Sequence, residues 1–202
     1  MTADSYITMK LNGIIRRKEK LNISDLDLWR KGGFILYARH GEATVGIDQL
    51  NLSFQDCMSQ RNLSEEGRRE AIYFGQLLRH WQIPVAPLII ASPFCRTIET
   101  AQLAFPNTCI QIDPFWFDIY SLGGKIPLNE QARILSNLQA VLEKKPPYRK
   151  NQVIIAHSFP KGIGLGNISN MGMVVVKPLG AGNGYEIVKK LTLENLARLN
   201  YQ

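Results

Sequence analysis

The chain has 202 residues, a length that suits one globular domain with its own core. Its 45% hydrophobic and 20% charged residues are typical of a soluble protein, and no apolar run reaches the ~18 residues that would favour a membrane span. The net charge of +7 favours anionic partners, but the basic residues lie in two separate clusters, so no nucleic-acid surface is predicted. Three cysteines without metal-ligand spacing argue against a disulfide framework and a metal site, and predict a cytoplasmic location.

The first thirty residues are predicted to form an N-terminal helical extension, 1–30. Charged residues interrupt its apolar ones, which is wrong for the apolar core of a secretory signal. Ser24 is expected to cap a helix that continues to the glycine pair Gly32-Gly33. We interpret this segment as a lid or brace beside the first strand.

Four short apolar runs are predicted to be buried strands, with helical patterns between them. The strands are expected at 34–38, 88–92, 109–112 and 152–156, with a final pair at 173–177 and 185–188. One helix is expected to begin at Ser64, and a second follows the 88–92 strand and ends at about Ala104. Two further helices are expected at 128–145 and 192–199. Strands that alternate with helices predict a three-layer α/β/α sandwich with a mostly parallel central sheet. We expect a single domain over 1–202.

Three of the predicted strands end in residues suited to phosphate. Arg39 and His40 follow the first strand, Arg96 comes just after the second, and His157 follows the fourth. In an open α/β sheet, ligands bind outside the carboxyl ends of the strands. Guanidinium forks match phosphate oxygens, and Gly41 lets the backbone come close. The sequence therefore predicts a phosphate site at this edge of the sheet.

A long polar stretch, 42–62, is attached directly to this site and is too irregular for a regular element. Loops of this length inside a compact domain are usually functional or mobile. Four residues near the site are candidates for orienting or contacting the substrate: Glu42, Thr44, Gln60 and Ser158. Turn-stabilising hydrogen bonds would explain the last three equally well. Cys57 and Cys95 flank the predicted pocket and are interpreted as small packing residues.

Four motifs occur in a fixed order along the chain. They are Arg39–Glu42, Leu63–Arg68 with a following Ala71, Ser92–Ala101 and Ala156–Ser158. This set resembles the histidine phosphatase superfamily, the phosphoglycerate-mutase-like proteins, and the likeness covers roughly residues 30 to 190. The run Gln60–Arg68 also resembles the small bacterial branch that includes lipopolysaccharide core heptose-phosphate phosphatases.

The resemblance implies that His40 is the nucleophile that takes the phosphoryl group and that Arg39, Arg96 and His157 bind the phosphate. A neutral imidazole, with an unperturbed pKa of ~6.5, is a competent nucleophile at neutral pH. Two arginines and a second histidine spread positive charge over the phosphoryl oxygens and replace a metal, so no cofactor is expected. The expected partner is a small-molecule phosphate ester, while the oligomeric state does not follow from the sequence.

The leaving group also needs a proton donor, which the resemblance places after the third strand. The run Ile112–Asp118 aligns with the mutase-like pattern Val-Asp-Pro-x-Leu-x-Glu and carries Asp118 in place of its glutamate, one methylene shorter. The aromatic residues 115–117 would raise the pKa of Asp118 by desolvation, as a general acid requires. A loop-capping carboxylate is the alternative interpretation, and Glu42 is a second candidate that we favour as an orienting residue.

The predicted activity is metal-independent hydrolysis of a phosphomonoester through phosphohistidine, on a small phosphorylated metabolite such as a sugar phosphate. A phosphomutase is the first alternative. Mutases of this type resemble longer chains with a Trp-Glu-Gly run where this chain has Tyr120–Gly124, so hydrolysis is favoured. A phosphate-binding regulatory module without turnover is the second alternative, and the presence of both histidines and both arginines argues against it.

Overall fold

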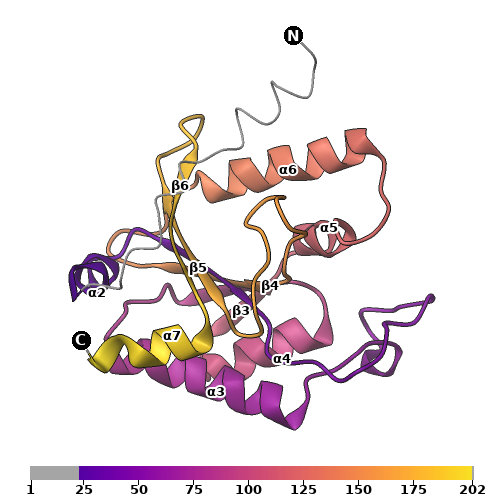
Figure 1. Cartoon of the computed structure of the whole chain (residues 1–202), viewed down its shortest axis with the longest axis horizontal. Helices are drawn as coiled ribbons and strands as arrows, with labels where there is room; N and C mark the ends of the chain where they lie inside the picture. The colour runs from indigo at the N-terminus through magenta and orange to yellow at the C-terminus, as the bar shows by residue number, and fades with distance from the viewer. Residues whose placement is uncertain (1–22, 202) are drawn as a thin grey trace.

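The computed structural model describes residues 23–201 and builds them around a six-stranded mixed sheet (Figure 1). The strands are β1 (Ile35–Arg39), β2 (Leu88–Ala91), β3 (Cys109–Ile112), β4 (Gln152–Ala156), β5 (Met173–Pro178) and β6 (Tyr185–Leu191). Their order in the sheet is β3-β2-β4-β1-β5-β6. The first four in this order run parallel, whereas β5 is antiparallel to both β1 and β6. The prediction of a mostly parallel central sheet is confirmed.

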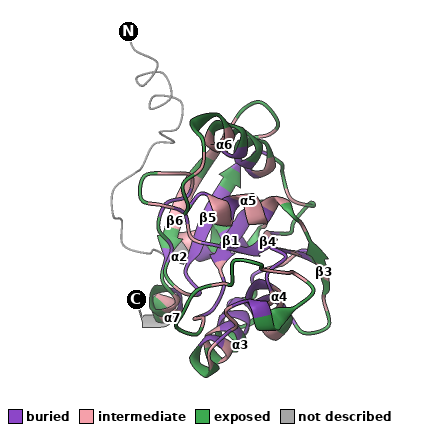
Figure 2. Ribbon diagram, turned by 90° about the vertical axis from the view of Figure 1, so that its right-hand side faces the viewer, coloured by how far each residue is buried: buried purple, intermediate pink, exposed green. Residues whose placement is uncertain are grey.

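Helices lie on both sides of this sheet. They are α2 (Ile23–Arg30), α3 (Glu65–His80), α4 (Cys95–Ala104), α5 (Phe115–Ser121), α6 (Leu128–Leu142) and α7 (Leu193–Ala197), with 3-10 turns η1 (Cys57–Ser59) and η2 (Arg198–Tyr201). Helices α3, α4 and α7 cover one face, and α5 and α6 cover the other (Figures 1 and 2). The predicted α/β/α layering is therefore confirmed.

Strand β1 explains why the predicted strands are apolar without alternation. Its Leu36 and Ala38 pack into the core on the α3 and α4 side, and its Ile35 and Tyr37 pack into the core on the α5 and α6 side. Figure 2 shows the buried colour running through the central strands. Because both faces of a parallel sheet are covered by helices, every position of a central strand must suit a core.

Helix α3 begins where the sequence predicts. The Ser64 hydroxyl accepts a hydrogen bond from the Gly67 N–H at 3.0 Å, which satisfies one of the free donors at the helix start. Ala71, Phe74 and Leu78 are buried at helical spacing against the sheet, as their periodicity indicates.

Two segments differ from expectation or extend beyond it. The stretch after β3, where no helix was predicted, forms helix α5, whose Trp116 ring packs on Tyr37 with ring centroids 5.5 Å apart. Pro114 precedes this helix, and the Asp113 carboxylate accepts the Phe115 N–H, so local chemistry favours the helix start. Of the predicted N-terminal extension, residues 23–30 form α2, and residues 1–22 lie outside the described residues.

The prediction against a disulfide is wrong. Cys57 and Cys95 are bonded, with an S–S distance of 2.04 Å and Cα atoms 5.7 Å apart, although 38 residues separate them. An odd number of cysteines still allows one pair beside the exposed free thiol of Cys109. The cysteine count therefore gives no support for a reducing compartment. None of the helices within residues 23–201 combines the length and the apolar character of a membrane span.

Candidate active site

The carboxyl ends of β2, β4 and β1 lie side by side and bring the two predicted histidines together. The His40 N–H donates to the Ala156 carbonyl at 3.1 Å, which continues the β1–β4 pairing by one residue. His157 follows Ala156 directly, and the ring centroids of the two histidines lie 5.5 Å apart. Two imidazoles at this separation can contact one phosphate group.

The tautomer of His40 follows from its hydrogen bonds. Its Nδ1 lies 2.6 Å from the carbonyl oxygen of Gly41, which can only accept, so Nδ1 carries the proton. Its Nε2 then has a free lone pair and accepts a hydrogen bond from the Nε of Arg96 at 3.3 Å. Burial, followed by the nearby charge of Arg96, lowers the pKa of His40 to about 3. The imidazole is therefore neutral at physiological pH, as a nitrogen nucleophile requires.

His157 is equally buried and is fixed from two sides. Its Nε2 lies 2.8 Å from the Ser92 hydroxyl, and the Tyr37 hydroxyl donates to its carbonyl oxygen at 2.7 Å. Burial, then the charges of His40 and Arg96, hold the pKa of His157 well below its usual range. The Ser92 contact leaves Nδ1 of His157 as the ring nitrogen that makes no hydrogen bond within the part of the chain the structure describes.

The two predicted arginines lie beside these histidines. Arg39 is half-buried and its Nη1 donates to the Ile168 carbonyl at 3.0 Å. Arg96 is fully buried, with its guanidinium carbon 4.1 Å from the centroid of the Phe94 ring. Burial lowers the pKa of both groups, although an arginine remains charged at physiological pH. The site thus combines fixed positive charge with neutral imidazoles.

Sequence reasoning missed Asp48 and Arg61 as site residues. Asp48 forms a two-point ion pair with Arg96 at 2.8 and 3.1 Å, and its side chain is only 5% exposed. The Arg61 N–H donates to the Asp48 carboxylate at 2.8 Å, and the Arg61 charge lowers the pKa of both histidines. The position of Arg61 within the Gln60–Arg68 run was a usable signal, whereas nothing in the sequence marks Asp48.

Glu42 and Gly41 shape the start of the loop, and Gly41 also contacts the His40 ring through its carbonyl oxygen. The Glu42 carboxylate accepts a hydrogen bond from the Ser64 hydroxyl at 2.8 Å, and the main-chain N–H of Glu42 donates to the Glu70 carboxylate at 2.7 Å. A Cβ at Gly41 would lie 2.4 Å from the Gly67 carbonyl oxygen. The absence of a side chain at Gly41 therefore serves the close approach of helix α3, where we expected it to serve the ligand.

The other loop candidates make the hydrogen bonds of loop braces. Gln60 accepts the Cys95 N–H and donates to the Ser53 carbonyl, both at 2.8 Å. The Ser158 hydroxyl accepts the Ile168 N–H at 2.8 Å. Thr44 is exposed and its N–H donates to the Asn62 carbonyl. The side-chain contacts of Gln60 and Ser158 fit the turn-stabilising interpretation, whereas the Thr44 contact involves only its main chain.

Asp118 forms an ion pair with a residue of helix α6. Its carboxylate pairs with Arg133 on α6 at 3.0 Å, and its side chain is 29% exposed. Because this segment is a helix, Trp116 and Ile119 turn into the core and Asp118 turns toward α6. The expected burial of Asp118 among aromatic rings is thus replaced by an ion pair, and among the described residues Asp118 makes no hydrogen bond to either histidine.

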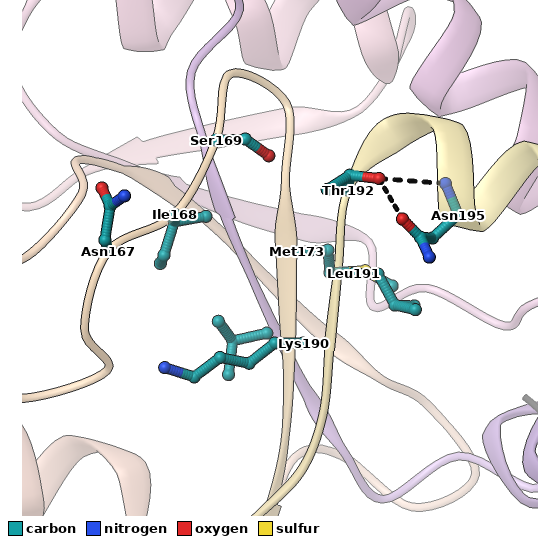
Figure 3. A pocket seen from close by; sticks show the side chains of 9 residues that line it. Asn167, Ile168, Ser169, Met173, Lys190, Leu191, Thr192 and Asn195 are labelled. Atoms are coloured by element: carbon teal, nitrogen blue, oxygen red, sulfur yellow. Dashed lines mark hydrogen bonds between the residues drawn. The ribbon is translucent and has the colours of Figure 1, made fainter. Parts of the chain in front are cut away.

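A cavity of about 290 Å³ opens beside Ile168, the residue that binds the Arg39 guanidinium. Ile168, whose carbonyl accepts from Arg39, lines it together with residues of β5, β6 and the start of α7 (Figure 3). Figure 3 shows Thr192 and Asn195 bonded to each other on one side, while the Lys190 amine points away from them. That amine donates to the Leu165 carbonyl, and neither histidine lines this cavity.

Solved structures share the architecture at low sequence identity. The protein histidine phosphatase SixA complexed with tungstate is 15% identical and has a TM-score of 0.51, over 81% of this chain and 99% of that one. A phosphoserine phosphatase mutant from Entamoeba histolytica, in complex with phosphoserine, is 15% identical with a TM-score of 0.50, over 81% and 98%. An Escherichia coli K-12 protein, provisionally described as an alpha-ribazole-5'-P phosphatase, is 13% identical with a TM-score of 0.53, over 80% and 97%. At these identities the likeness establishes the fold.

No curated protein matches the chain in sequence. A family model does match it: residues 35–120 fit the model of the histidine phosphatase superfamily (branch 1). The matched stretch contains Arg39, His40, Arg61 and Arg96, and the remaining site residue, His157, is placed beside them by the sheet. Over residues 35–120 the chain is thus similar to the histidine phosphatase superfamily (branch 1), and its fold agrees with that likeness.

Proposed function

We propose that the chain is a metal-independent phosphomonoester hydrolase that acts through a phosphohistidine at His40. The observation that carries the proposal is the fixed state of His40: its Nδ1 proton is held by the Gly41 carbonyl, and its Nε2 lone pair faces the Arg96 guanidinium. A lone pair that faces a positive group is suited to attack an anion that the same group binds. The phosphatases of similar fold support this proposal.

The reaction follows from these contacts in two displacements. A phosphomonoester binds with its phosphoryl oxygens among Arg39, Arg61, Arg96 and His157, and Nε2 of His40 attacks phosphorus in line with the ester oxygen. The P–O bond breaks and the alcohol leaves with a proton. Water then attacks the phosphohistidine and releases orthophosphate. The guanidinium groups stabilise charge on the phosphoryl oxygens in both steps, which is the task that a metal performs in other phosphoryl-transfer enzymes.

We keep Asp118 as the proposed proton donor and Glu42 as its alternative. Asp118 reaches this role only if substrate binding separates it from Arg133. Replacing the acid should slow an alkyl phosphate far more than p-nitrophenyl phosphate, because nitrophenolate leaves without a proton. Comparison of Asp118→Asn with Glu42→Gln on both substrates identifies the donor, and equal slowing of both substrates argues against either role.

The proposed substrate is a small phosphorylated metabolite, such as a sugar phosphate, in the cytoplasm. The basic site and the Gln60–Arg68 run, which resembles heptose-phosphate phosphatases, motivate this choice. A panel of sugar, nucleotide and amino-acid phosphates, together with a phosphohistidine protein, would rank the substrate classes.

The direct test is hydrolysis of p-nitrophenyl phosphate in the presence of EDTA. We expect p-nitrophenol release by the native chain, and loss of both activity and an acid-labile phosphoenzyme in His40→Ala. His80→Ala, on the exposed end of α3, is the matched control and should behave as the native chain. A phosphoenzyme that persists in His40→Ala would refute the nucleophile. Inactivity on the whole panel would instead favour a phosphate-binding module, and a phosphoenzyme that resists water would favour a mutase.

A further inference from the structure

The Asp48 carboxylate accepts four hydrogen bonds, two of them from Arg96. We propose that Asp48 is a positioning residue for Arg96, which it holds with one edge of the guanidinium turned toward the reacting phosphoryl group. The inference rests on the proposed function, in which Arg96 binds that group. Asp48 belongs to the polar loop 42–62, and neither the family match nor the sequence motifs give it a role.

All the hydrogen-bonding capacity of the Asp48 carboxylate is used. A carboxylate has about four acceptor sites. Oδ1 accepts from the Arg61 N–H at 2.8 Å and from Nη1 of Arg96 at 2.8 Å. Oδ2 accepts from Nη2 of Arg96 at 3.1 Å and from the Tyr120 hydroxyl at 2.8 Å. A main-chain N–H from the loop and a hydroxyl from α5 are therefore both directed at one carboxylate, which indicates a built anchor.

This anchor decides which edge of Arg96 faces His40. A guanidinium presents its five N–H groups in a rigid plane, so fixing one edge fixes the others. Asp48 takes the edge formed by Nη1 and Nη2, and the Nε–H then points at Nε2 of His40, 3.3 Å away. When a phosphoryl group occupies the space before His40, the Nε–H and the second hydrogen of Nη2 are the donors left for its oxygens. Asp48, Arg96 and His40 thus form a carboxylate–guanidinium–imidazole chain.

Burial makes this arrangement depend on the carboxylate. The Arg96 side chain is 0% exposed, and without Asp48 its charge would be buried with no anionic partner among residues 23–201. Burial raises the pKa of Asp48, but hydrogen bonds from the Arg61 N–H and from Arg96 outweigh it and hold that pKa below its ordinary value. Asp48 is therefore an anion throughout the neutral range and is unsuited to donate a proton itself.

A competing role, in which Asp48 blocks the phosphate site, predicts a change in phosphate affinity of the opposite sign. A carboxylate on an arginine fork can mimic substrate phosphate and block the site, in which case its removal would tighten phosphate binding and lower KM. A positioning residue gives the reverse: its removal weakens phosphate binding and lowers kcat. The two roles are therefore separated by the direction of change alone.

The test compares Asp48→Asn with the control Asp56→Asn, the same chemical change at an exposed position of the same loop. We expect Asp48→Asn to lower kcat on p-nitrophenyl phosphate and to raise the inhibition constant of orthophosphate by about ten- to a hundred-fold, the range for a lost charged hydrogen bond. Asp56→Asn should leave both unchanged. Tighter orthophosphate binding by Asp48→Asn would overturn the proposal.

A second comparison shows whether Asp48 acts through Arg96. In an Arg96→Lys background, which lacks the guanidinium fork, Asp48→Asn should cause almost no further loss in kcat. Fully additive losses in kcat would show that Asp48 does not act through Arg96. Tyr120→Phe removes one of the four hydrogen bonds and should give a smaller loss in the same direction, so the proposal stays testable if Asp48→Asn does not fold. If the native chain hydrolyses nothing, the proposed function fails, and orthophosphate affinity measured by calorimetry still decides the role of Asp48.

Discussion

A single main-chain carbonyl determines the chemistry available to His40. Because the Gly41 oxygen takes the Nδ1 proton, the nitrogen that faces Arg96 is unprotonated before any substrate arrives. His157 is held in a similarly buried setting by Ser92 and Tyr37. Both imidazoles are therefore kept neutral by their surroundings. Keeping these imidazoles neutral should lower the free energy of unfolding at acidic pH.

The stability of the fold should fall on acidification because of His40. The unfolded chain takes up a proton at this residue below a pH of ~6.5, whereas the folded chain does so only near its lowered pKa of about 3. Stability from this source is thus present above ~6.5 and lost as the pH falls, by roughly 1.4 kcal/mol per pH unit. Urea unfolding between pH 7 and 5 should show a shallower pH dependence for His40→Gln than for the native chain. Equal slopes for the two proteins would contradict the assigned pKa.

The loop 42–62 and helix α4 behave as one unit because several bonds join them. The Cys57–Cys95 disulfide links the loop to the first residue of α4, and Gln60 accepts the Cys95 N–H beside it. Arg96, the next residue of the helix, pairs with Asp48 of the same loop. The position of Arg96 is therefore secured both by the helix and by the loop that covers it.

Loss of the disulfide should loosen this unit. Cys57→Ser/Cys95→Ser frees a 38-residue segment of the unfolded chain and should lower the free energy of unfolding by about 2–4 kcal/mol. A dithiol reductant, which takes the S–S bond to two thiols, should lower the thermal midpoint of the native chain and leave that of the double variant unchanged. Cys109→Ser, at the exposed free thiol, is the control and should retain sensitivity to reductant. An unchanged thermal midpoint of the native chain, once the S–S bond is shown to be reduced, would contradict this prediction.

At the scale of the whole molecule, the three layers gather charge from distant segments. Arg39 ends β1, Arg61 precedes α3 and Arg96 lies in α4, and the charge of Arg61 lowers the pKa of both other arginines. Like charges held this close oppose folding when no anion is bound. An anion that binds among them relieves the repulsion and therefore favours the folded chain.

Orthophosphate should accordingly stabilise the native protein beyond the effect of ionic strength. At a hundred times its dissociation constant, the expected gain is about 2.7 kcal/mol. Thermal unfolding in phosphate and in sodium chloride of equal ionic strength measures it. Arg61→Gln should reduce the gain, whereas Arg69→Gln, at an exposed position of α3, should not. Equal midpoints in the two salts would show that the arginines do not form an anion site.

Most of the fold was predictable because local chemistry determines it. Apolar runs between glycines and prolines indicate strands wherever both faces are covered, and Ser64 marks the start of α3 because its hydroxyl can satisfy a nearby N–H. Helix α5 was missed because the proline and aromatic residues that begin it also suit a loop. The orientation of Asp118 was missed for the same reason, since only a helix turns it toward Arg133.

The sequence by itself determined the layered α/β architecture and the phosphate-suited residues at the strand ends, because each of these depends on neighbours within a few positions. Tertiary structure alone decided the Cys57–Cys95 bond, the anchoring of Arg96 by Asp48 and the neutral tautomer of His40. The first two join residues 38 and 48 positions apart. The third requires burial and a carbonyl held at one angle. Such contacts leave no periodic trace along the chain, because they are made only when the sheet and its covering loops are in place.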